Sequence, residues 1–552
     1  MFGSTRTRFF VALYVLVALS GMVLTYLPPT SDSTAARSPE VVAQAPAGPA
    51  SPPTVVAARA PLPRPTEQAK ASAQMVHENL VATPGGAPAG GVVSEISEGA
   101  DLYTVKPGES LASISFRYLP RTMFMTTGEL EAALRQANPS LANERLRPGL
   151  QIMIPGIEPQ PIVEHPRAIS KDTEIRAIYL TGWTAGSERG LSLIRRWKEA
   201  GGNAICFDIK DFDGQITVSF DHPLASRRSP LIRNLPKFIR FMHQQDLHVI
   251  ARIALFRDEH IAKDHPDLAV QSRRGNGAWR ENGKQVWADP SRREVQDYNI
   301  ALARRAAAAG ADEIQFDYVR FPAEGDQADA RFQFESENPE AQPAGDAPQA
   351  SGVTVPSRWT RSRVITEFLH RAYAEIHPTG ALLSLDVFGV MAWGRAIDLA
   401  HTGQNIAEMV RHCDALSPMI YPSHFFGMDG YARPGDAPEH FIGSSMKRFR
   451  EITAGSGVVL RPWLQAFAWH TPSYSPDYVV TQVSVANQHG GVGYLFWNAN
   501  NDYSKPFAAM PALTGLARRR ESEKAEPKER AASTLPAAAT VPTPAVETKA
   551  NF

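Results

Sequence analysis

The sequence predicts an α/β protein whose largest part is a (β/α)8 TIM barrel. Three observations lead to this fold class. Eight short apolar runs alternate with stretches of helical periodicity between residue 175 and about residue 513. Several of these runs alternate carboxylates with apolar side chains, as expected for strands that line an enclosed interior. No glycine-rich phosphate loop follows the first run, which argues against the alternative, an open doubly wound sheet.

The apolar runs have the length of strands, and the stretches between them have the composition of helices. We expect strands at Ile175–Leu180, Ala204–Ile209, Val249–Leu255, Ile314–Val319, Leu382–Phe388, Leu416–Tyr421, Pro462–Phe467 and Val492–Trp497. The clearest helical stretches are Leu191–Ala200, Glu294–Ala309, Val364–Ile376 and Pro438–Thr453. Because strand and helix alternate, the sheet should be parallel, and we place the barrel domain at residues 174–513.

The chain begins with a candidate membrane segment. Residues 9–27 form an uncharged run behind Arg6 and Arg8. A helix of that length nearly spans a bilayer core of about 30 Å, and no clear small-x-small cleavage site follows it. We therefore predict a transmembrane signal anchor at 9–27, with residues 1–8 as a basic cytoplasmic end; a cleaved signal peptide is the alternative. The expected location is the inner (cytoplasmic) membrane, single-pass, with the bulk of the chain periplasmic or extracytoplasmic.

Two further segments lack the apolar periodicity of folded domains. Residues 28–100 are rich in Pro and Ala and residues 516–552 in Ala, Pro, Glu and Lys, so we predict a disordered linker and a disordered tail. In the whole chain 57 basic residues match 57 acidic ones, and nothing favours nucleic acid as a partner. Cys206 and Cys413 fall on opposite sides of the predicted barrel, so we expect no disulfide between them.

Residues 102–156 differ from the segments around them. Tyr103–Leu111 and Leu146–Pro155 have strand character and enclose a helical middle. This small α+β segment resembles a LysM module, and the resemblance implies binding of N-acetylglucosamine-containing polymers such as peptidoglycan. The stretch Pro120–Leu134 is longer than in the usual module and closer to LysM-like variants of envelope assembly proteins, so a protein-contact role is the alternative.

The fourth predicted strand carries the first candidate for catalysis. Phe316 and Tyr318 share one face of this strand, whereas Gln315 and Asp317 share the other, which would turn Asp317 into the barrel. A carboxylate at the C-terminal end of a parallel strand is where a (β/α)8 barrel builds its active site. The alternative is that Asp317 only pairs with Arg320 or caps the following loop.

Two other strands also turn carboxylates inward. The same alternation places Asp208 and Lys210 on the inner side of the second strand and Asp386 on the inner side of the fifth. Buried charge costs several kcal/mol per ion unless it is paired or lies at a wet rim, so these carboxylates suggest a site. Cleavage of a glycosidic bond needs two carboxylates about 5 to 9 Å apart, which Asp317 and Asp386 on adjacent strands could provide. The alternative is a ring of inner salt bridges that supports the barrel.

Aromatic side chains are expected near the barrel mouth. Tyr421 ends the sixth predicted strand and Trp497 the eighth, and they could give a sugar ring a hydrogen bond and a flat apolar surface. Trp287, in the long loop after the third strand, could line a cleft, although each of these aromatics could equally belong to the core. The acidic loop at 323–356 is predicted to be a disordered insertion; a flexible lid is the alternative.

Five motifs along the barrel carry a family resemblance. They are Asp208–Asp211 with Gly214, Trp287–Pro290 with Tyr298–Asn299, Asp312–Pro322, Asp386–Gly389 and Ser417–Ser423. In these motifs and their order the chain resembles a bacterial family of glycoside-hydrolase-like proteins, formerly filed as a domain of unknown function and placed with the TIM-barrel transglycosidases.

The resemblance implies glycosidase chemistry with Asp317 and Asp386 as the acid/base pair. Asp208 and Lys210 would then bind sugar hydroxyls or tune the pKa of Asp317. Arg320 would hold Asp317 ionised or bind an acidic group of the substrate. The chain lacks the chitinase-type acidic run that ends in a catalytic glutamate, so a chitinase mechanism is not implied.

Two functions remain open at this point. The first is a cell-envelope glycoside hydrolase that cleaves peptidoglycan or an exported polysaccharide and needs no cofactor. The second is a non-catalytic glycan-binding or envelope scaffolding protein, which would bind glycan equally well without the two carboxylates. Metal-dependent deacetylation is disfavoured, because the 15 histidines show no paired spacing near the strand ends, and we predict no metal ligand.

Overall fold

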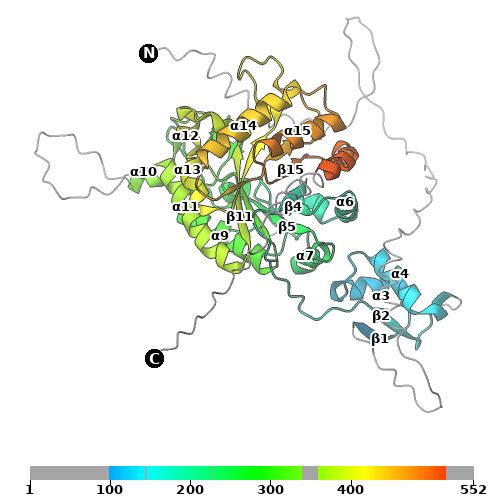
Figure 1. Ribbon diagram of the computed structural model, residues 1–552. Helices are drawn as coiled ribbons and strands as arrows, with labels where there is room; N and C mark the ends of the chain where they lie inside the picture. Colours follow the sequence, from blue (N-terminus) through cyan, green and yellow to red (C-terminus); the bar gives the residue numbers. More distant parts are fainter. Residues whose placement is uncertain (1–98, 143–145, 227, 338–358, 517–552) are drawn as a thin grey trace, which may run out of the picture.

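The computed structural model describes residues 99–142, 146–226, 228–337 and 359–516. These residues form a small N-terminal module and a larger (β/α)8 barrel (Figure 1). The predicted signal anchor, nearly all of the linker and all but the first residue of the tail lie outside the described residues. In the described part of the chain, no helix is both long enough and apolar enough to span a bilayer.

The barrel is a closed parallel sheet. Its strands are β3 (Ile175–Leu180), β4 (Ala204–Lys210), β5 (His248–Ala254), β9 (Glu313–Asp317), β11 (Leu382–Phe388), β12 (Ala415–Ile420), β13 (Val459–Leu460), β14 (Trp463–Gln465) and β15 (Gly493–Trp497). They are ordered β11-β9-β5-β4-β3-β15-β14-β12, and β12 pairs back with β11 to close the ring. β13 and β14 both pair with β12 and act as one strand interrupted at Pro462, which has no N–H to donate. The predicted fold class and its eight strands are confirmed.

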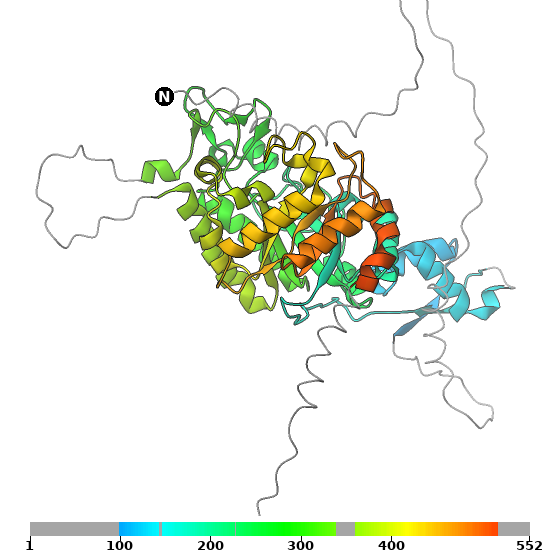
Figure 2. The same ribbon diagram turned by 45° about the horizontal axis from the view of Figure 1, so that its top comes forward.

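Helices surround the sheet, as Figure 2 shows. They are α5 (Gly182–Ala185), α6 (Glu188–Glu199), α7 (Leu235–His243), α8 (Glu259–Asp264), α9 (Arg293–Ala308), α10 (Phe334–Glu337), α11 (Arg361–Ile376), α12 (Ala396–Thr402), α13 (Ile406–Met409), α14 (Pro438–Ile452) and α15 (Pro476–Gln488). Side-chain caps mark several starts, such as Ser187 on α6 and Ser475 on α15. The main core lies between sheet and helices, where Phe207 and Phe316 point outward from their strands.

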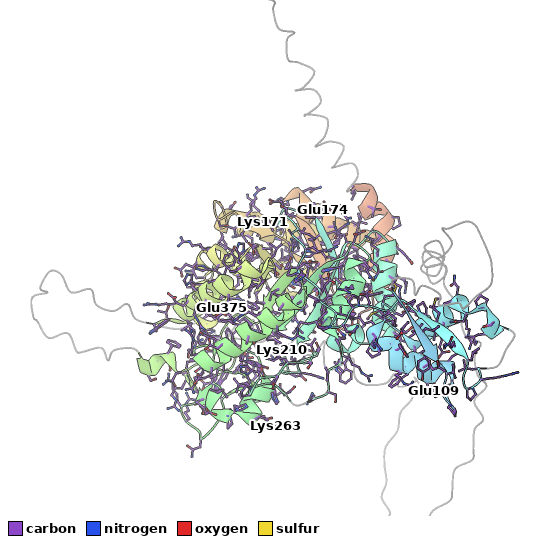
Figure 3. All side chains as sticks on the ribbon, turned by 90° about the horizontal axis from the view of Figure 1, so that it is seen from below. Glu109, Lys171, Glu174, Lys210, Lys263 and Glu375 are labelled. Carbon is purple, nitrogen blue, oxygen red and sulfur yellow. The ribbon has the colours of Figure 1, made fainter. Side chains whose placement is uncertain are left out.

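The small module has the expected LysM arrangement. Its strands β1 (Ala100–Thr104) and β2 (Gln151–Pro155) pair in antiparallel fashion, and α3 (Leu111–Tyr118) and α4 (Thr127–Ala137) lie between them in sequence. Each helix starts with a capping box, at Ser110 and at Thr126. Figure 3 shows Glu109 on this module, where it accepts a hydrogen bond from the Tyr103 hydroxyl at 2.7 Å.

The module contacts the barrel on the side of α6 and α7. Arg195 of α6 forms an ion pair with Glu129 of α4, and the Lys237 ammonium of α7 donates to the backbone carbonyl of Leu119. Burial lowers the pKa of Lys237 to about 8. Arg240 of α7 pairs with Glu158, just after the module. These polar contacts fix the module beside the barrel.

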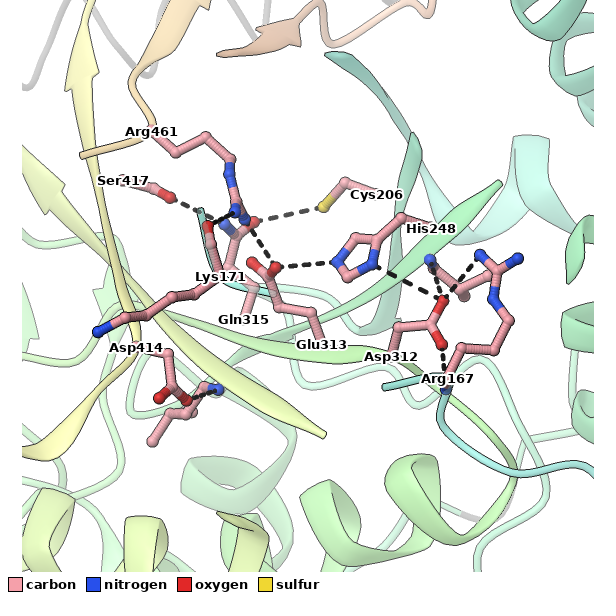
Figure 4. A network of polar contacts seen from close by, with 12 residues as sticks. Arg167, Lys171, Cys206, His248, Asp312, Glu313, Gln315, Asp414, Ser417 and Arg461 are labelled. Carbon is pink, nitrogen blue, oxygen red and sulfur yellow. Dashed lines mark hydrogen bonds and ion pairs between the residues drawn. The ribbon is translucent and has the colours of Figure 1, made fainter. Parts of the chain in front are cut away.

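The N-terminal ends of the strands are closed by a buried polar network (Figure 4). Glu313 at the start of β9 accepts a hydrogen bond from Arg461 at 2.7 Å and contacts His248 Nε2 at 3.0 Å. Asp312 accepts from the backbone N–H groups of Arg167 and Val249. Although burial raises the pKa of Glu313, Arg461 and His248 outweigh it and lower this pKa to about 2. The network ties the strand starts together at the end opposite the expected active site.

The loops after β5 and β9 fold against each other at the C-terminal end of the barrel. β6 (Gln271–Ser272) pairs with β10 (Ala330–Arg331), and β7 (Arg280–Glu281) pairs with β8 (Gln285–Val286). The predicted disordered insertion 323–356 is therefore too long, because residues 323–337 have a defined structure. Phe332 and Phe334 pack on Phe321 and stabilise residues 323–337 against the barrel. The acidic composition of the segment does not indicate this apolar contact. Residues 338–358 lie outside the described residues.

Candidate active site

Three carboxylates surround one guanidinium inside the C-terminal half of the barrel. Arg252 of β5 contacts Asp208 Oδ1 of β4 at 2.5 Å and Asp317 Oδ2 of β9 at 2.5 Å. Its Nε lies 3.8 Å from Asp386 Oδ2 of β11. All four side chains are buried, and Asp317, at 7%, is the most exposed of them. Since one cation faces three acids in a low-dielectric interior, the three acids cannot all be ionised without strong repulsion.

The environment of Asp386 favours its protonated form. Burial and the nearby charge of Asp317 raise the pKa of Asp386 well above its usual value, and Arg252 offsets this only in part. The indole of Trp463 donates to Asp386 Oδ1 at 2.7 Å and fixes the orientation of the carboxyl group. Asp386 Oδ2 has no hydrogen-bond partner among the described residues. A proton on Oδ2 would thus be oriented and uncommitted, as a general acid requires.

Asp208 is held more firmly by its neighbours. It accepts a hydrogen bond from the Tyr179 hydroxyl of β3 and pairs with Arg252. Burial raises the pKa of Asp208 to about 7, although the charge of Arg252 opposes the rise. With both oxygens occupied, Asp208 is placed to orient Arg252 rather than to meet a substrate.

Asp317 lies at the end of its strand, where the backbone turns sharply. Its Oδ1 accepts a hydrogen bond from the backbone N–H of Tyr318 at 2.6 Å, and Tyr318 has a left-handed φ of 52°. A non-glycine residue in that region carries backbone strain, which tends to persist at functional sites. The other oxygen, Oδ2, accepts a hydrogen bond from Arg252.

Aromatic rings border the acid cluster. Trp497 is half-buried and lies between Tyr179, at a ring-centroid distance of 6.4 Å, and Tyr421, at 5.8 Å. Burial and the charges of Asp386 and Asp317 raise the pKa of Tyr421 well above its usual value, which reflects how near Tyr421 lies to both acids. The structure therefore brings Tyr421 and Trp497 together with Asp208, Asp317 and Asp386.

Three of the predicted site residues form no hydrogen bond or ion pair with the three acids in the described part of the chain. Lys210 forms a fully buried ion pair with Asp258 at 2.7 Å and donates to Asn299 of α9, because a register shift between Asp208 and Lys210 turns it away from the acids. Arg320 and Trp287 pack on each other, with the guanidinium carbon 4.7 Å from the indole ring, and Trp287 is fully buried. Arg320 makes no ion pair with Asp317 among the described contacts; Arg252 does.

Arg252 is the functional candidate that the sequence-based reasoning missed. The third strand is predicted from its apolar residues, and the single arginine within it does not contribute to that pattern. Alternation along Ile250, Arg252 and Ala254 places this arginine on the inner face. Tyr179 at the inner end of β3 can be found by the same argument.

The comparisons with known proteins agree with this architecture. A family model described as "Putative glycosyl hydrolase domain" matches residues 177–503, and one described as "LysM domain" matches residues 103–155. No curated protein matches the chain.

Several solved structures are similar to the chain. A hypothetical protein from Ruminiclostridium thermocellum is 31% identical over 38% of this chain and 97% of that chain, with a TM-score of 0.30. The glycoside hydrolase domain of PgaB (BpsB) from Bordetella bronchiseptica is 15% identical over 61% and 99%, with a TM-score of 0.45. A GH18 chitinase from Pseudoalteromonas aurantia is 10% identical over 62% and 99%, with a TM-score of 0.34. Since the first family model spans more than half of the chain, the protein belongs to that glycosyl hydrolase-type family and carries a LysM domain before the barrel.

Proposed function

We propose that this protein is a glycoside hydrolase of the cell envelope that cleaves peptidoglycan or another exported polysaccharide. The observation that carries the proposal is the acid cluster: Asp386, kept protonated by burial and by Asp317, faces the same guanidinium as Asp317. Glycosidic cleavage requires one carboxylic acid and one carboxylate beside the scissile bond. Membership of the glycosyl hydrolase-type family supports the same chemistry.

The two acids take different roles. The proton on Asp386 Oδ2 passes to the glycosidic oxygen while the bond from that oxygen to the anomeric carbon breaks. Asp317 then either attacks the anomeric carbon or removes a proton from an attacking water. The first course retains the anomeric configuration and the second inverts it. In the first course, water then breaks the bond between Asp317 and the anomeric carbon, and Asp386 takes the proton of that water. In the second, Asp317 releases the proton it removed to solvent and Asp386 regains one from solvent.

Arg252, Asp208 and Tyr179 support these two acids. The hydrogen bonds that link Tyr179 to Asp208 and Asp208 to Arg252 hold the guanidinium in one place. Arg252 in turn forms an ion pair with Asp317 and supplies a positive charge beside it. Their effect on turnover is through the position and charge of Asp317 and Asp386.

The substrate class is inferred from the organisation of the chain. A LysM domain at residues 103–155 supports binding of a glycan polymer, and its contacts with α6 and α7 hold it beside the barrel. We propose that the segment 9–27 anchors the protein in the inner membrane, so that the barrel acts on glycan outside it. Fractionation of cells that express the protein with and without residues 1–27 tests this anchoring, because soluble full-length protein would contradict it.

The hydrolase proposal is tested by incubating the purified full-length protein with a panel of glycans that includes peptidoglycan. Release of reducing ends or soluble muropeptides should occur with one of them. Asp317→Asn and Asp386→Asn should abolish release, whereas Asp264→Asn, at an exposed position of α8, should leave it unchanged. If no glycan is cleaved and one is bound equally by the parent and both site variants, the protein is a binding module instead.

A further inference from the structure

Two buried arginines contact Tyr318, the residue after Asp317, and form no ion pair in the described part of the chain. Arg257 follows β5 and Arg320 follows β9, and each is only 5% exposed. Elsewhere in this barrel the buried cations Arg252 and Arg461 are paired with carboxylates. Within the described ranges, by contrast, no carboxylate forms an ion pair with Arg257 or with Arg320. Buried guanidinium groups in this condition need another source of compensation.

Both arginines flank Tyr318, the strained residue next to Asp317. Each guanidinium carbon lies 5.4 Å from the centre of the Tyr318 ring, and Arg257 also donates to the Tyr318 hydroxyl at 3.0 Å. The Nε atom of Arg257 is buried and has no hydrogen-bond partner among the described residues. The two guanidinium groups therefore share contact with Tyr318, and the charges of Arg257 and Asp317 both reach Arg320.

The remaining contacts of the two arginines are mostly aromatic. Arg257 lies 4.4 Å from the ring centre of Phe212, and Arg320 lies 4.5 Å from that of Phe388. Arg320 donates one hydrogen bond, to the backbone carbonyl of Phe321. Burial lowers the pKa of Arg320 and the charge of Arg257 acts in the same direction, while the charges of Glu281, Tyr318 and Asp317 offset this only in part. Aromatic faces compensate a cation less fully than an anion does.

Two acids whose charges reach the arginines accept hydrogen bonds from other groups. Glu281, whose charge reaches Arg320, accepts hydrogen bonds from the Trp287 indole and from the backbone N–H of Glu324. Asp211, whose pKa is influenced by Arg257, accepts from the backbone N–H of Phe212. Neither of these two acids closes an ion pair with the arginine near it.

We propose that Arg257 and Arg320 form a subsite that binds a carboxylate carried by the sugar residue next to the scissile bond. The planar guanidinium fork matches a carboxylate in two parallel hydrogen bonds, and the flanking aromatic rings suit the apolar face of a sugar. The substrate would then be an acidic glycan, with the acid either a lactyl ether on an amino sugar or a uronic acid. This inference rests on the proposed hydrolase function, which places a sugar beside Asp317.

The test compares acidic and neutral monosaccharides that the enzyme cannot cleave. Titrations of the full-length protein, followed by NMR, should use N-acetylmuramic acid against N-acetylglucosamine and glucuronic acid against glucose. At least one acidic sugar should bind about tenfold more tightly than its neutral counterpart, as expected for charge-assisted hydrogen bonds in a buried site. The pair that shows the preference identifies the source of the carboxylate. Equal affinity within both pairs overturns the proposal.

Variants of the two arginines test whether the preference for acidic sugars arises at this subsite. Arg257→Gln and Arg320→Gln should each reduce the preference towards unity, whereas Arg274→Gln, at an exposed loop position, should keep it. Arg320→Lys retains the positive charge but lacks the planar guanidinium group, so it should also weaken the preference for acidic sugars. It replaces Arg320→Gln in the test if that variant does not fold. An undiminished preference in folded variants would contradict the assignment. Because no turnover is measured, this result stands apart from the hydrolase test: a protein that cleaves neutral glycans without any acid preference refutes the subsite alone.

Discussion

Replacement of Arg252 by methionine is the perturbation with the largest expected effect on the barrel. The side chain is 6% exposed and, among the described residues, is the one cation in contact with Asp208, Asp317 and Asp386. Removal of one partner from a buried ion pair costs about 3–5 kcal/mol, because the charge that remains is uncompensated. For a domain of this size that corresponds to a decrease in Tm of about 6–10 °C near neutral pH.

The loss should depend on pH in a defined direction. Burial raises the pKa of Asp208 to about 7, so Asp208 is largely protonated at pH 5, and burial also raises the pKa of Asp386 well above its usual value. At pH 8 Asp208 is ionised and needs Arg252, whereas at pH 5 the protonated Asp208 needs it less. Arg252→Met should therefore destabilise the protein less at pH 5 than at pH 8.

Thermal unfolding of the parent and Arg252→Met at pH 5 and pH 8, followed by calorimetry, measures both effects. Arg433→Met is a suitable control, since Arg433 is largely exposed and pairs with Asp436 on the surface. The reasoning is refuted if Arg252→Met unfolds within 2 °C of the parent at pH 8, where roughly three times that decrease is expected. A loss that is larger at pH 5 would equally contradict it.

Three other substitutions test separate parts of the structure. Asp208→Asn should gain stability relative to the parent as pH rises from about 4 to 7. The raised pKa of Asp208 stabilises the parent at low pH, and this stabilisation is lost as the pH rises through that range. Denaturant titrations at several pH values measure the difference in unfolding free energy. Glu313→Gln should lower the unfolding free energy by about 3–5 kcal/mol at pH 7, since Arg461 loses its buried partner. This loss should become smaller as pH falls from about 4.5 to about 2, the lowered pKa of Glu313. Urea unfolding across this pH range measures the change. Trp183 is 65% exposed on α5, directly after the C-terminal end of β3. If its indole stacks on the glycan, Trp183→Ala should raise KM roughly fivefold with little change in kcat. An unchanged KM would show that Trp183 does not bind the glycan.

The sequence contained enough information for the barrel and for its inward-facing acids. Alternation of side chains along a strand is a strict geometric rule, so the residue pattern alone assigns Asp208, Asp317 and Asp386 to one interior. β3 and β11 have the expected ranges, and most other strand ends differ by one or two residues, as for β9, which begins at Glu313 and ends at Asp317. Such differences do not change which residues face inward.

Other parts of the site depend on features that alternation does not describe. A register shift after Asp208 redirects Lys210 to Asp258, and no pattern of residue types marks that shift. The left-handed turn at Tyr318 ends the strand early, so Arg320 no longer follows the alternation and packs under Trp287 instead. The partners of a buried charge are set by packing between distant segments, which a single sequence does not reveal.

The central claim, that Asp386 is the proton donor and Asp317 acts on the anomeric carbon or on water, is tested most directly by changing the leaving group. The measurement is kcat/KM for Asp386→Asn and Asp317→Asn on the glycan identified above and on an aryl glycoside of the same sugar with an acidic phenol as leaving group. Such a phenol departs without protonation, so Asp386→Asn should lose about 10²–10⁴-fold on the glycan but little on the aryl glycoside. Asp317→Asn should lose activity on both. Equal losses for Asp386→Asn on the two substrates would contradict its role as the acid.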